Sequence, residues 1–278
     1  MAELTRISNH MWAIGFLLND LGAFQTPALY AIRARELILD VFEATAGSRM
    51  MCNYMRFGGL ARDFPDKLRG EDTVQFITDL VENRLPKAID ELDHFLTENE
   101  IVRSRCIGVG VLPPEKAIAY SAGGPLLRAS GVPYDLRTAD PYGIYDRFDF
   151  EVPIGDGRKG TIGDCWDRFY VRVCEIRESI KIVRQALDQL PKTGDVHQSM
   201  PKKIRPPKGS IYRRTESPRG DLGYYIESDG SDIPYRVKMR SPAFTALSVL
   251  NEIGSGWLMS DVLGILGSLD IVLGEIDR

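Results

Sequence analysis

The stretch FYVRVCEIRESIKIVRQAL, residues 169–187, decides the fold class of this chain of 278 residues. Its large apolar side chains recur every three or four residues, which is the period of an α-helix with one buried face. We expect a helix over about residues 161–190, with a seam that faces another helix. The seam consists of Phe169, Val173, Ile176, Ile180, Val183 and Leu187.

Two further helices are predicted at the start of the chain. Residues 3–21 are amphipathic, and Gly22 is positioned to end the first helix. Thr26 followed by Pro27 is typical of an N-cap and a first-turn proline, so a second helix begins there and ends near Gly47. The short link between them predicts an antiparallel pair.

The next segment combines a turn signal with a long helix. Residues 49–59, RMMCNYMRFGG, are β-like or irregular, and the paired glycines at the end indicate a tight turn or a close backbone approach. A helix is expected over about residues 71–98, where Pro86 should kink it.

The second half of the chain contains loops and a small β element. GDLGYYIES (220–228) and PYRVKMRS (234–241) flank DGSDI and predict a β-hairpin with Asp-Gly at the turn. Two final helices are expected over 243–254 and 257–269. The prediction is one α-rich α+β domain over 1–278, divided into a helical part (1–110), a structured loop region (111–160), a long helix (161–190), a basic, proline-rich linker (191–214) and a hairpin with a C-terminal tail (215–278).

Composition narrows the possible functions. The formal net charge of −4 gives no general attraction to nucleic acid, and Asp261 and Asp270 interrupt the apolar tail well short of a membrane span. The four cysteines form no CxxC pair and the three histidines are far apart, which disfavours a self-contained metal site. No Gly-x-Ser-x-Gly elbow is present. Charged residues of alternating sign run through the middle loop, and this pattern favours structural ion pairs. The charged residues are Arg128, Asp135, Arg137, Asp140, Asp146, Arg147 and Asp149.

Two aspartates stand out because aliphatic side chains flank them. Asp270 lies within LGSLDIVLGEIDR (266–278), and Asp20 lies at the predicted end of the first helix. A buried, unpaired carboxylate is costly, so each is solvated, paired or functional. From the residues alone, a surface role and a role in proton chemistry or ligand binding are about equally favoured.

Several stretches together resemble one protein family. They are ELTRISNH (3–10), LLNDLGAF (17–24), SRMMCNYMRFGGL (48–60), GPLLRASGVPYDLRTADPYGIYDRFDFEVP (124–153) and ESPRGDLGYYIESDGSDIPYRVKMRSPAF (216–244) with the final GEIDR. They resemble the 49 kDa, or D, subunit of the proton-pumping NADH:quinone oxidoreductase, respiratory complex I, and its cyanobacterial and chloroplast H-subunit relatives. The resemblance implies a helical core like that of the large subunit of nickel-iron hydrogenases. The C-terminal CxxC metal motif of those hydrogenases is absent here, which argues against hydrogen activation.

The resemblance also implies a set of site residues. Asp270 and Val272 match residues that line a quinone cavity, and Asp20 matches a helix-end aspartate that pairs with a histidine at the quinone head. Asp20 and Asp270 are then the expected catalytic residues, which set the polarity and protonation of the cavity. Arg56, with Met51 and Cys52, matches the segment near a 4Fe-4S cluster held by the partner subunit.

The same resemblance implies partners and a location. We expect a small iron-sulfur (B) subunit, a C (30 kDa) subunit and the membrane-arm H subunit, with the chain peripheral on the cytoplasmic face of the plasma membrane. It would bind no metal itself; NADH and FMN would act elsewhere in the complex.

Two departures from the family pattern have consequences. There is no histidine between Gly47 and Gly59, where the family commonly has one, so we expect the potential of the cluster to depend weakly on pH. The family's N-terminal portion, with a histidine and a tyrosine that hold the quinone head, precedes Met1, so an N-terminally truncated chain that is inactive alone is expected. The alternatives are a non-catalytic scaffold, or the equivalent subunit of a ferredoxin- or deazaflavin-dependent membrane dehydrogenase.

Overall fold

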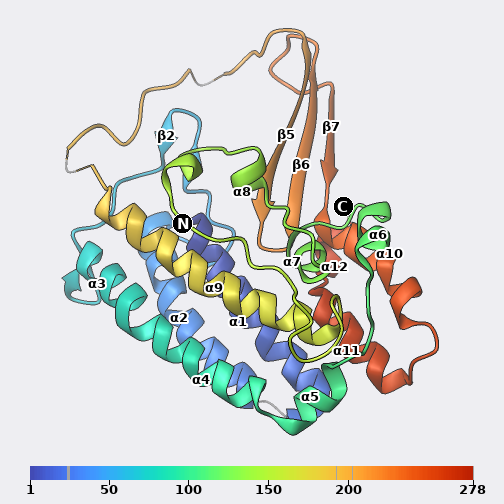
Figure 1. Ribbon diagram of the computed structural model, residues 1–278. Helices are drawn as coiled ribbons and strands as arrows, with labels where there is room; N and C mark the ends of the chain where they lie inside the picture. Colours follow the sequence, from blue (N-terminus) through green and yellow to red (C-terminus); the bar gives the residue numbers. More distant parts are fainter. Residues whose placement is uncertain (24–25, 192, 202, 278) are drawn as a thin grey trace.

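The apolar seam forms the helix α9 (Cys165–Asp188) in a computed structural model of the protein, which describes residues 1–23, 26–191, 193–201 and 203–277. The helix begins later than predicted because Asp164 caps it, accepting a hydrogen bond from the backbone N–H of Asp167. Four seam residues are buried, and Ile180 and Leu187 are half-buried. Helix α9 packs against α1, α4, α7 and α11 (Figure 1).

A second face of α9 is also buried, and it is charged. Arg168, Arg172 and Glu175, spaced four and three residues apart, are at most 3% exposed. Buried charges require partners, because an isolated charge in the protein interior costs several kcal/mol. This charged face was not predicted from the sequence.

The predicted N-terminal helix pair is confirmed. Helix α1 (Ala2–Leu18) continues into a π-helical turn, η1 (Asn19–Ala23), in which Gly22 has a φ of +95°, and α2 (Thr26–Ala46) returns alongside α1. A π turn widens the helix and ends its regular hydrogen bonding. Asp20 therefore lies in an irregular turn at the end of α1.

The helix predicted over 71–98 is interrupted. It consists of α3 (Thr73–Asp79), the π-helical turn η2 (Leu80–Arg84) and α4 (Leu85–Thr97), and α5 (Glu100–Cys106) follows. The π turn ends at Arg84, two residues before Pro86, and Pro86 has no N–H to donate to the preceding turn. The expected disturbance at Pro86 therefore takes the form of a π turn.

The glycine pair at 58–59 serves a close backbone approach. Strands β1 (Met55–Arg56) and β2 (Gly59–Leu60) form a hairpin, and a second small hairpin, β3 (Lys67–Leu68) with β4 (Glu71–Asp72), follows. Residues 196–198 of the linker pair with the first hairpin, because Leu60 N–H donates to Val196 O (2.9 Å) and Gln198 N–H donates to Gly58 O (2.8 Å). A Cβ atom on Gly59 would lie 2.3 Å from Val196 O, so only glycine fits.

The β element has one strand more than predicted. Strands β5 (Gly209–Ser217), β6 (Gly220–Ser228) and β7 (Arg236–Arg240) form an antiparallel sheet that extends away from the helices (Figure 1). The predicted β6–β7 hairpin is present. Residues 209–214, which the sequence pattern placed in the linker, instead belong to β5.

Short helices complete the architecture. The loop region contains α6 (Pro114–Ala119), α7 (Gly124–Ala129), α8 (Leu136–Ala139) and the 3₁₀ turn η3 (Tyr145–Arg147). The predicted final helices are α10 (Pro242–Gly254) and α11 (Met259–Leu269), and a short α12 (Leu273–Ile276) follows. The α-rich α+β class is confirmed.

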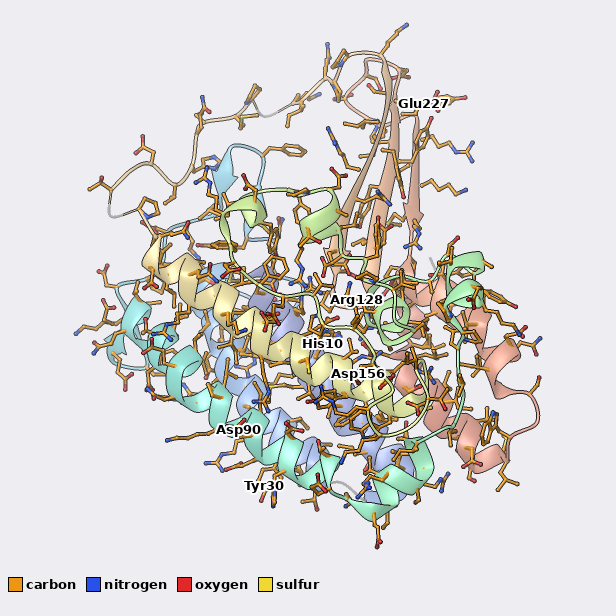
Figure 2. The ribbon with its side chains drawn as sticks, viewed as in Figure 1. His10, Tyr30, Asp90, Arg128, Asp156 and Glu227 are labelled. Atoms are coloured by element: carbon orange, nitrogen blue, oxygen red, sulfur yellow. The ribbon has the colours of Figure 1, made fainter. Side chains whose placement is uncertain are left out.

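Arg128 is the centre of a buried network of charges. Its guanidinium contacts Glu175 of α9 at 2.7 Å, Glu216 of β5 at 2.9 Å and Asp135 at 3.3 Å, and all four side chains are at most 1% exposed. Glu175 also contacts Nε2 of the buried His10 at 2.8 Å. Figure 2 labels Arg128 and His10 near the middle of the molecule, below the sheet, and both residues are 0% exposed.

The network continues to the start of α1. Arg137 contacts Asp135 at 2.7 Å and Glu3 at 3.1 Å, and Glu3 also accepts a hydrogen bond from Ser179 of α9. Burial alone would favour the neutral acid, but Arg6 and Arg137 outweigh it and lower the pKa of Glu3 to about 2. The structural interpretation of the alternating charges is confirmed for Arg128, Asp135 and Arg137. Asp140, Asp146, Arg147 and Asp149 are exposed.

Removal of the central arginine should destabilise the fold severely. Arg128→Met leaves three buried carboxylates without their shared cation, so we expect the free energy of unfolding to fall by about 3–5 kcal/mol. Arg213→Met, at an exposed position of β5, is the control and should change it by less than about 0.5 kcal/mol. Chemical denaturation measures both, and an equal effect of the two substitutions would contradict the network's role.

Glu3 should make the fold sensitive to acid. Its pKa of about 2 in the folded protein lies below the ordinary 4.5, so its charge stabilises the fold above pH 4.5 and this contribution is lost as the pH falls toward 2. Glu3→Gln should remove about 3 kcal/mol at neutral pH and flatten the pH dependence of unfolding between 4.5 and 2. Urea titrations across this window, with the exposed Glu115→Gln as control, measure the effect. Parallel curves for Glu3→Gln and the unsubstituted protein would refute it.

Candidate functional site

Asp270 is paired. It ends α11 in the left-handed conformation (φ +54°), and its carboxylate contacts the Arg219 guanidinium at 3.0 Å and accepts a hydrogen bond from Asn9 Nδ2 at 2.9 Å. Arg219 Nε also donates to the backbone oxygen of Asp270 at 2.9 Å. The carboxylate thus has a direct cationic partner, and its side chain is 8% exposed.

Asp20 approaches the same end of α11 from another direction. A Cβ atom on Gly267 would lie 3.0 Å from Asp20 Oδ2, and the N–H of Asp270 donates to Gly267 O at 3.2 Å. The two aspartates therefore flank the last turn of one helix. Asp20 is exposed as a residue, but partial burial of its carboxylate raises its pKa.

Arg168 of α9 fixes the last turn of α11. Its fully buried guanidinium donates to Ser268 Oγ at 2.9 Å, to Gly163 O at 2.6 Å and to Gly110 O at 2.9 Å. Ser268 precedes Asp270 by two residues and has no exposed surface. This contact holds the position from which Asp270 projects.

Arg219 is held in place through the charge network. Arg6 of α1 donates to the backbone oxygens of Glu216 (2.7 Å) and Ser217 (3.1 Å), at the end of β5. The turn that follows carries Arg219. It also packs tightly on α7, since a Cβ atom on Gly124 would lie 2.5 Å from the Cα of Gly220.

Val272 follows Asp270 by two residues and is half-buried at the start of α12. It lies on the same segment as Asp270. Leu273, the next residue, is exposed.

The remaining predicted residues lie on a different part of the molecule. Met51, Cys52 and Arg56 follow the end of α2 and belong to the β1–β2 hairpin or its approach, whereas Asp20 lies just before the start of α2. Because α2 has 21 residues, roughly 30 Å of helix separates the two groups. Met51 is fully exposed with a φ of +55°, Arg56 is exposed, and burial raises the pKa of the half-buried Cys52.

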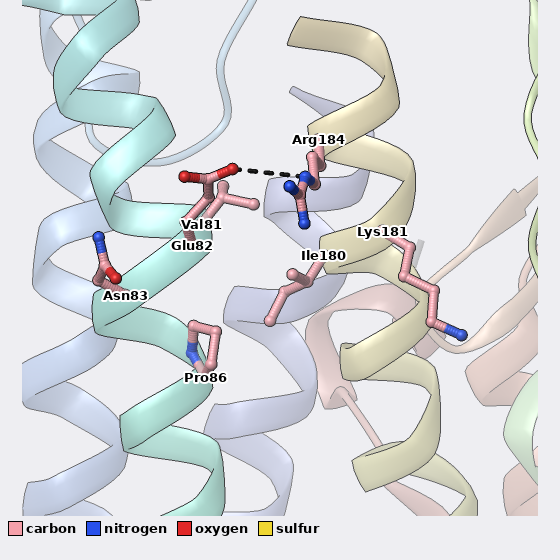
Figure 3. Close-up of a pocket in the computed structure, with 7 residues that line it drawn as sticks. All are labelled: Val81, Glu82, Asn83, Pro86, Ile180, Lys181 and Arg184. Atoms are coloured by element: carbon pink, nitrogen blue, oxygen red, sulfur yellow. Dashed lines mark ion pairs between the residues drawn. The ribbon is translucent and has the colours of Figure 1, made fainter. Parts of the chain in front are cut away.

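Two surface cavities lie elsewhere on the described part of the molecule. One is lined by residues of η2, α4 and α9, including Glu82 and Arg184, which form an ion pair at 3.4 Å (Figure 3). A second lies between the sheet and α10 and includes Tyr212, Tyr225 and Phe244. Neither includes Asp20 or Asp270.

The part of the chain that the structure describes contains no group of three or more His, Cys, Asp or Glu side chains that could hold a metal ion. No helix there has the length and apolar character needed to cross a bilayer.

The partners of Asp270 were not predicted from the sequence. Asn9 and Arg219 are 261 and 51 residues away from it, and neither stands in a local motif with it. The charged face of α9 did carry a signal, because Arg168, Arg172 and Glu175 follow the same helical period as the apolar seam.

Comparison with known proteins identifies the family. The model of the respiratory-chain NADH dehydrogenase 49 Kd subunit matches residues 20–278. The chain is 50% identical to the first of the NADH-quinone oxidoreductase D subunits of Roseiflexus sp., over all of this chain and 73% of the relative. It is 49% identical to the second D subunit of Herpetosiphon aurantiacus, over all of this chain and 73% of that relative, and 47% identical to the D subunit from Dehalococcoides mccartyi, over 99% and 72%.

These matches cover almost the whole chain, and they agree with the α-rich α+β architecture. The chain therefore belongs to the family of the 49 kDa subunit of respiratory-chain NADH dehydrogenase, whose members include the D subunits of NADH-quinone oxidoreductases.

Proposed function

We propose that this chain forms part of the wall of the quinone cavity of a proton-translocating NADH:quinone oxidoreductase, with Asp20, Asp270 and Val272 facing the quinone. One observation carries the proposal: the fold brings Asp20 and Asp270 together at the last turn of α11, although 250 residues separate them in the sequence. The names of the relatives supply the substrate class, because each is a subunit of an NADH-quinone oxidoreductase.

The two aspartates are suited to different tasks. Reduction of a quinone to a quinol takes two electrons and two protons. Asp20 forms no ion pair with the residues that the structure describes, and its pKa is raised, which suits a group that passes protons. Asp270 is tied to Arg219 and Asn9, so we assign it the fixed polar contact that orients the quinone head.

The partners follow from the same proposal. The β1–β2 hairpin, with Met51, Cys52 and Arg56, would face the small iron-sulfur (B) subunit and its terminal 4Fe-4S cluster. Exposed apolar side chains on this segment support a covered surface, since Met51, Met55 and Phe57 are 100%, 67% and 77% exposed. The C (30 kDa) and membrane-arm H subunits would complete the contacts, with the chain peripheral on the cytoplasmic face of the membrane.

Substitution of each aspartate in the intact complex tests the proposal. Asp20→Asn should lower the NADH:quinone turnover on the order of 100-fold, because the proton-carrying group is lost. Asp270→Asn should raise the KM for quinone and weaken inhibitors of the quinone site. The rate with an artificial acceptor that takes electrons upstream of the quinone should stay unchanged in both, which reports assembly.

Asp229→Asn, at the turn of the β6–β7 hairpin, is the matched control and should leave all of these rates unchanged. Full quinone turnover and inhibitor sensitivity in both the Asp20 and the Asp270 variants would contradict the roles assigned to these residues and would favour a non-catalytic scaffold role for this chain.

A further inference from the structure

Two buried cations of α9 lie behind the last turn of α11. Arg168 and Arg172 are at most 3% exposed, and neither forms an ion pair with the described residues. Arg168 donates to the Ser268 hydroxyl, to two backbone oxygens and to the Cys165 sulfur. Arg172 donates from Nη1 to Arg168 O at 2.9 Å, and its Nε has no hydrogen-bond partner. Because a buried guanidinium without a carboxylate is costly, these two charges require a negative group nearby.

The position of Arg172 relates it to Asp270. On the same face of α9, Arg168 lies one turn earlier and contacts α11 two residues before Asp270. Glu175 lies one turn later and contacts α1 beside the residue that donates to Asp270. Burial lowers the pKa of Arg172, and the Asp270 carboxylate opposes this shift most strongly. Arg172 therefore balances the charge of Asp270 from the interior.

Arg219 approaches Asp270 from the outer side. Its Nη2 contacts Oδ1 of Asp270 at 3.0 Å, its Nε donates to the backbone oxygen, and its side chain is 18% exposed. Its Nη1 forms no hydrogen bond with the described residues and is not among their enclosed, unpartnered polar atoms. One carboxylate thus lies between two guanidinium groups, and the outer one keeps N–H groups for a ligand.

The last turn of α11 consequently carries more positive than negative charge. Asp270 has a cation on each side, and Arg168 adds another through Ser268. The second carboxylate at this turn is Asp20, and its partial burial raises its pKa and favours the neutral acid. An excess of fixed cations favours a ligand that becomes negatively charged during the reaction.

We propose that Arg219 is a further catalytic residue, whose free N–H groups stabilise the quinone anion formed by the first electron. Arg172 is a positioning residue, since it offsets Asp270 and leaves the charge of Arg219 to the quinone. The inference rests on the proposed function and names the group that meets the developing charge.

The electrons and protons of this step balance. An iron-sulfur cluster passes electrons singly, so the partner's cluster is oxidised by one electron and the quinone becomes a radical anion beside Arg219. A second electron from the cluster, which NADH reduces again, and two protons complete the quinol. Asp20 donates one proton and regains it from solvent, and solvent supplies the other.

Substitution of Arg219 in the intact complex tests the inference. Arg219→Gln should lower kcat with a short-chain quinone on the order of 100-fold and leave KM nearly unchanged, because only the charged intermediate loses a contact. The radical signal that a quinone-site inhibitor removes, followed by electron paramagnetic resonance during NADH oxidation, should disappear. Arg219→Lys keeps the charge and should retain the signal. Arg213→Gln, at an exposed position of β5, is the matched control and should change neither.

Arg172→Gln is a second variant that leaves Arg219 intact, and it should lower kcat and weaken the radical signal. The rate with an artificial acceptor upstream of the quinone reports assembly of each variant. A raised KM with an unchanged radical signal in Arg219→Gln would show that Arg219 only holds Asp270, and would overturn the inference. Full turnover in Arg219→Gln, with turnover lost in Asp20→Asn, would also overturn it and leave the proposed function standing. Full turnover in the Arg219, Asp20 and Asp270 variants would overturn both.

Discussion

Arg128 lies, fully buried, among three carboxylates that come from three distant parts of the chain. Glu175 is on α9, Glu216 is on β5, and Asp135 precedes α8. A single cation thus joins the long helix, the sheet and the loop region. Such a cluster need not add much net stability, because each charge has lost its water. It does favour this arrangement, because a packing that separated Arg128 from these carboxylates would leave buried charges unpaired.

The candidate site depends on this arrangement through α1. Arg6, within the network, holds the end of β5, and the turn after β5 presents Arg219 to Asp270. Asn9 donates to Asp270, while the next residue, His10, contacts Glu175 in the network. The position of the Asp270 carboxylate is therefore determined from two sides by the same helix. Arg168 adds a third constraint through Ser268.

Local patterns predicted most of the helices and failed where partners are remote. Four predicted features depend only on neighbours in the sequence, and the structure contains all of them. They are the apolar seam of α9, the end of the first helix near Gly22, the start of the second helix at Thr26 and the disturbance near Pro86. Strand β5 was missed because GSIYRRTES lacks a regular apolar alternation; both faces of much of it are exposed. The charged face of α9 was missed because charged residues at a helical period ordinarily indicate solvent, and only the fold supplies their partners.

The site residues divide in the same way. The sequence raised three possibilities for Asp270, and the structure shows a paired carboxylate whose main partner is 51 residues away. Asp20 and Asp270 were chosen through resemblance, and their approach to one helix end could not be derived from either segment alone. The glycine pair at 58–59 was correctly interpreted as a close approach, but the approaching segment, 196–198, had been regarded only as linker.

In the proposed complex, the last turn of α11 faces a bound quinone together with Asp270, which ends this helix, and Asp20 of the neighbouring η1 turn. Photoaffinity labelling of the intact complex with a quinone that carries its reactive group on the head tests this claim most directly. Mass spectrometry should locate the label on peptides that contain residues 259–273 or the η1 turn around Asp20, and excess unlabelled quinone should prevent labelling. Competable labelling of this chain confined to other segments would contradict the account.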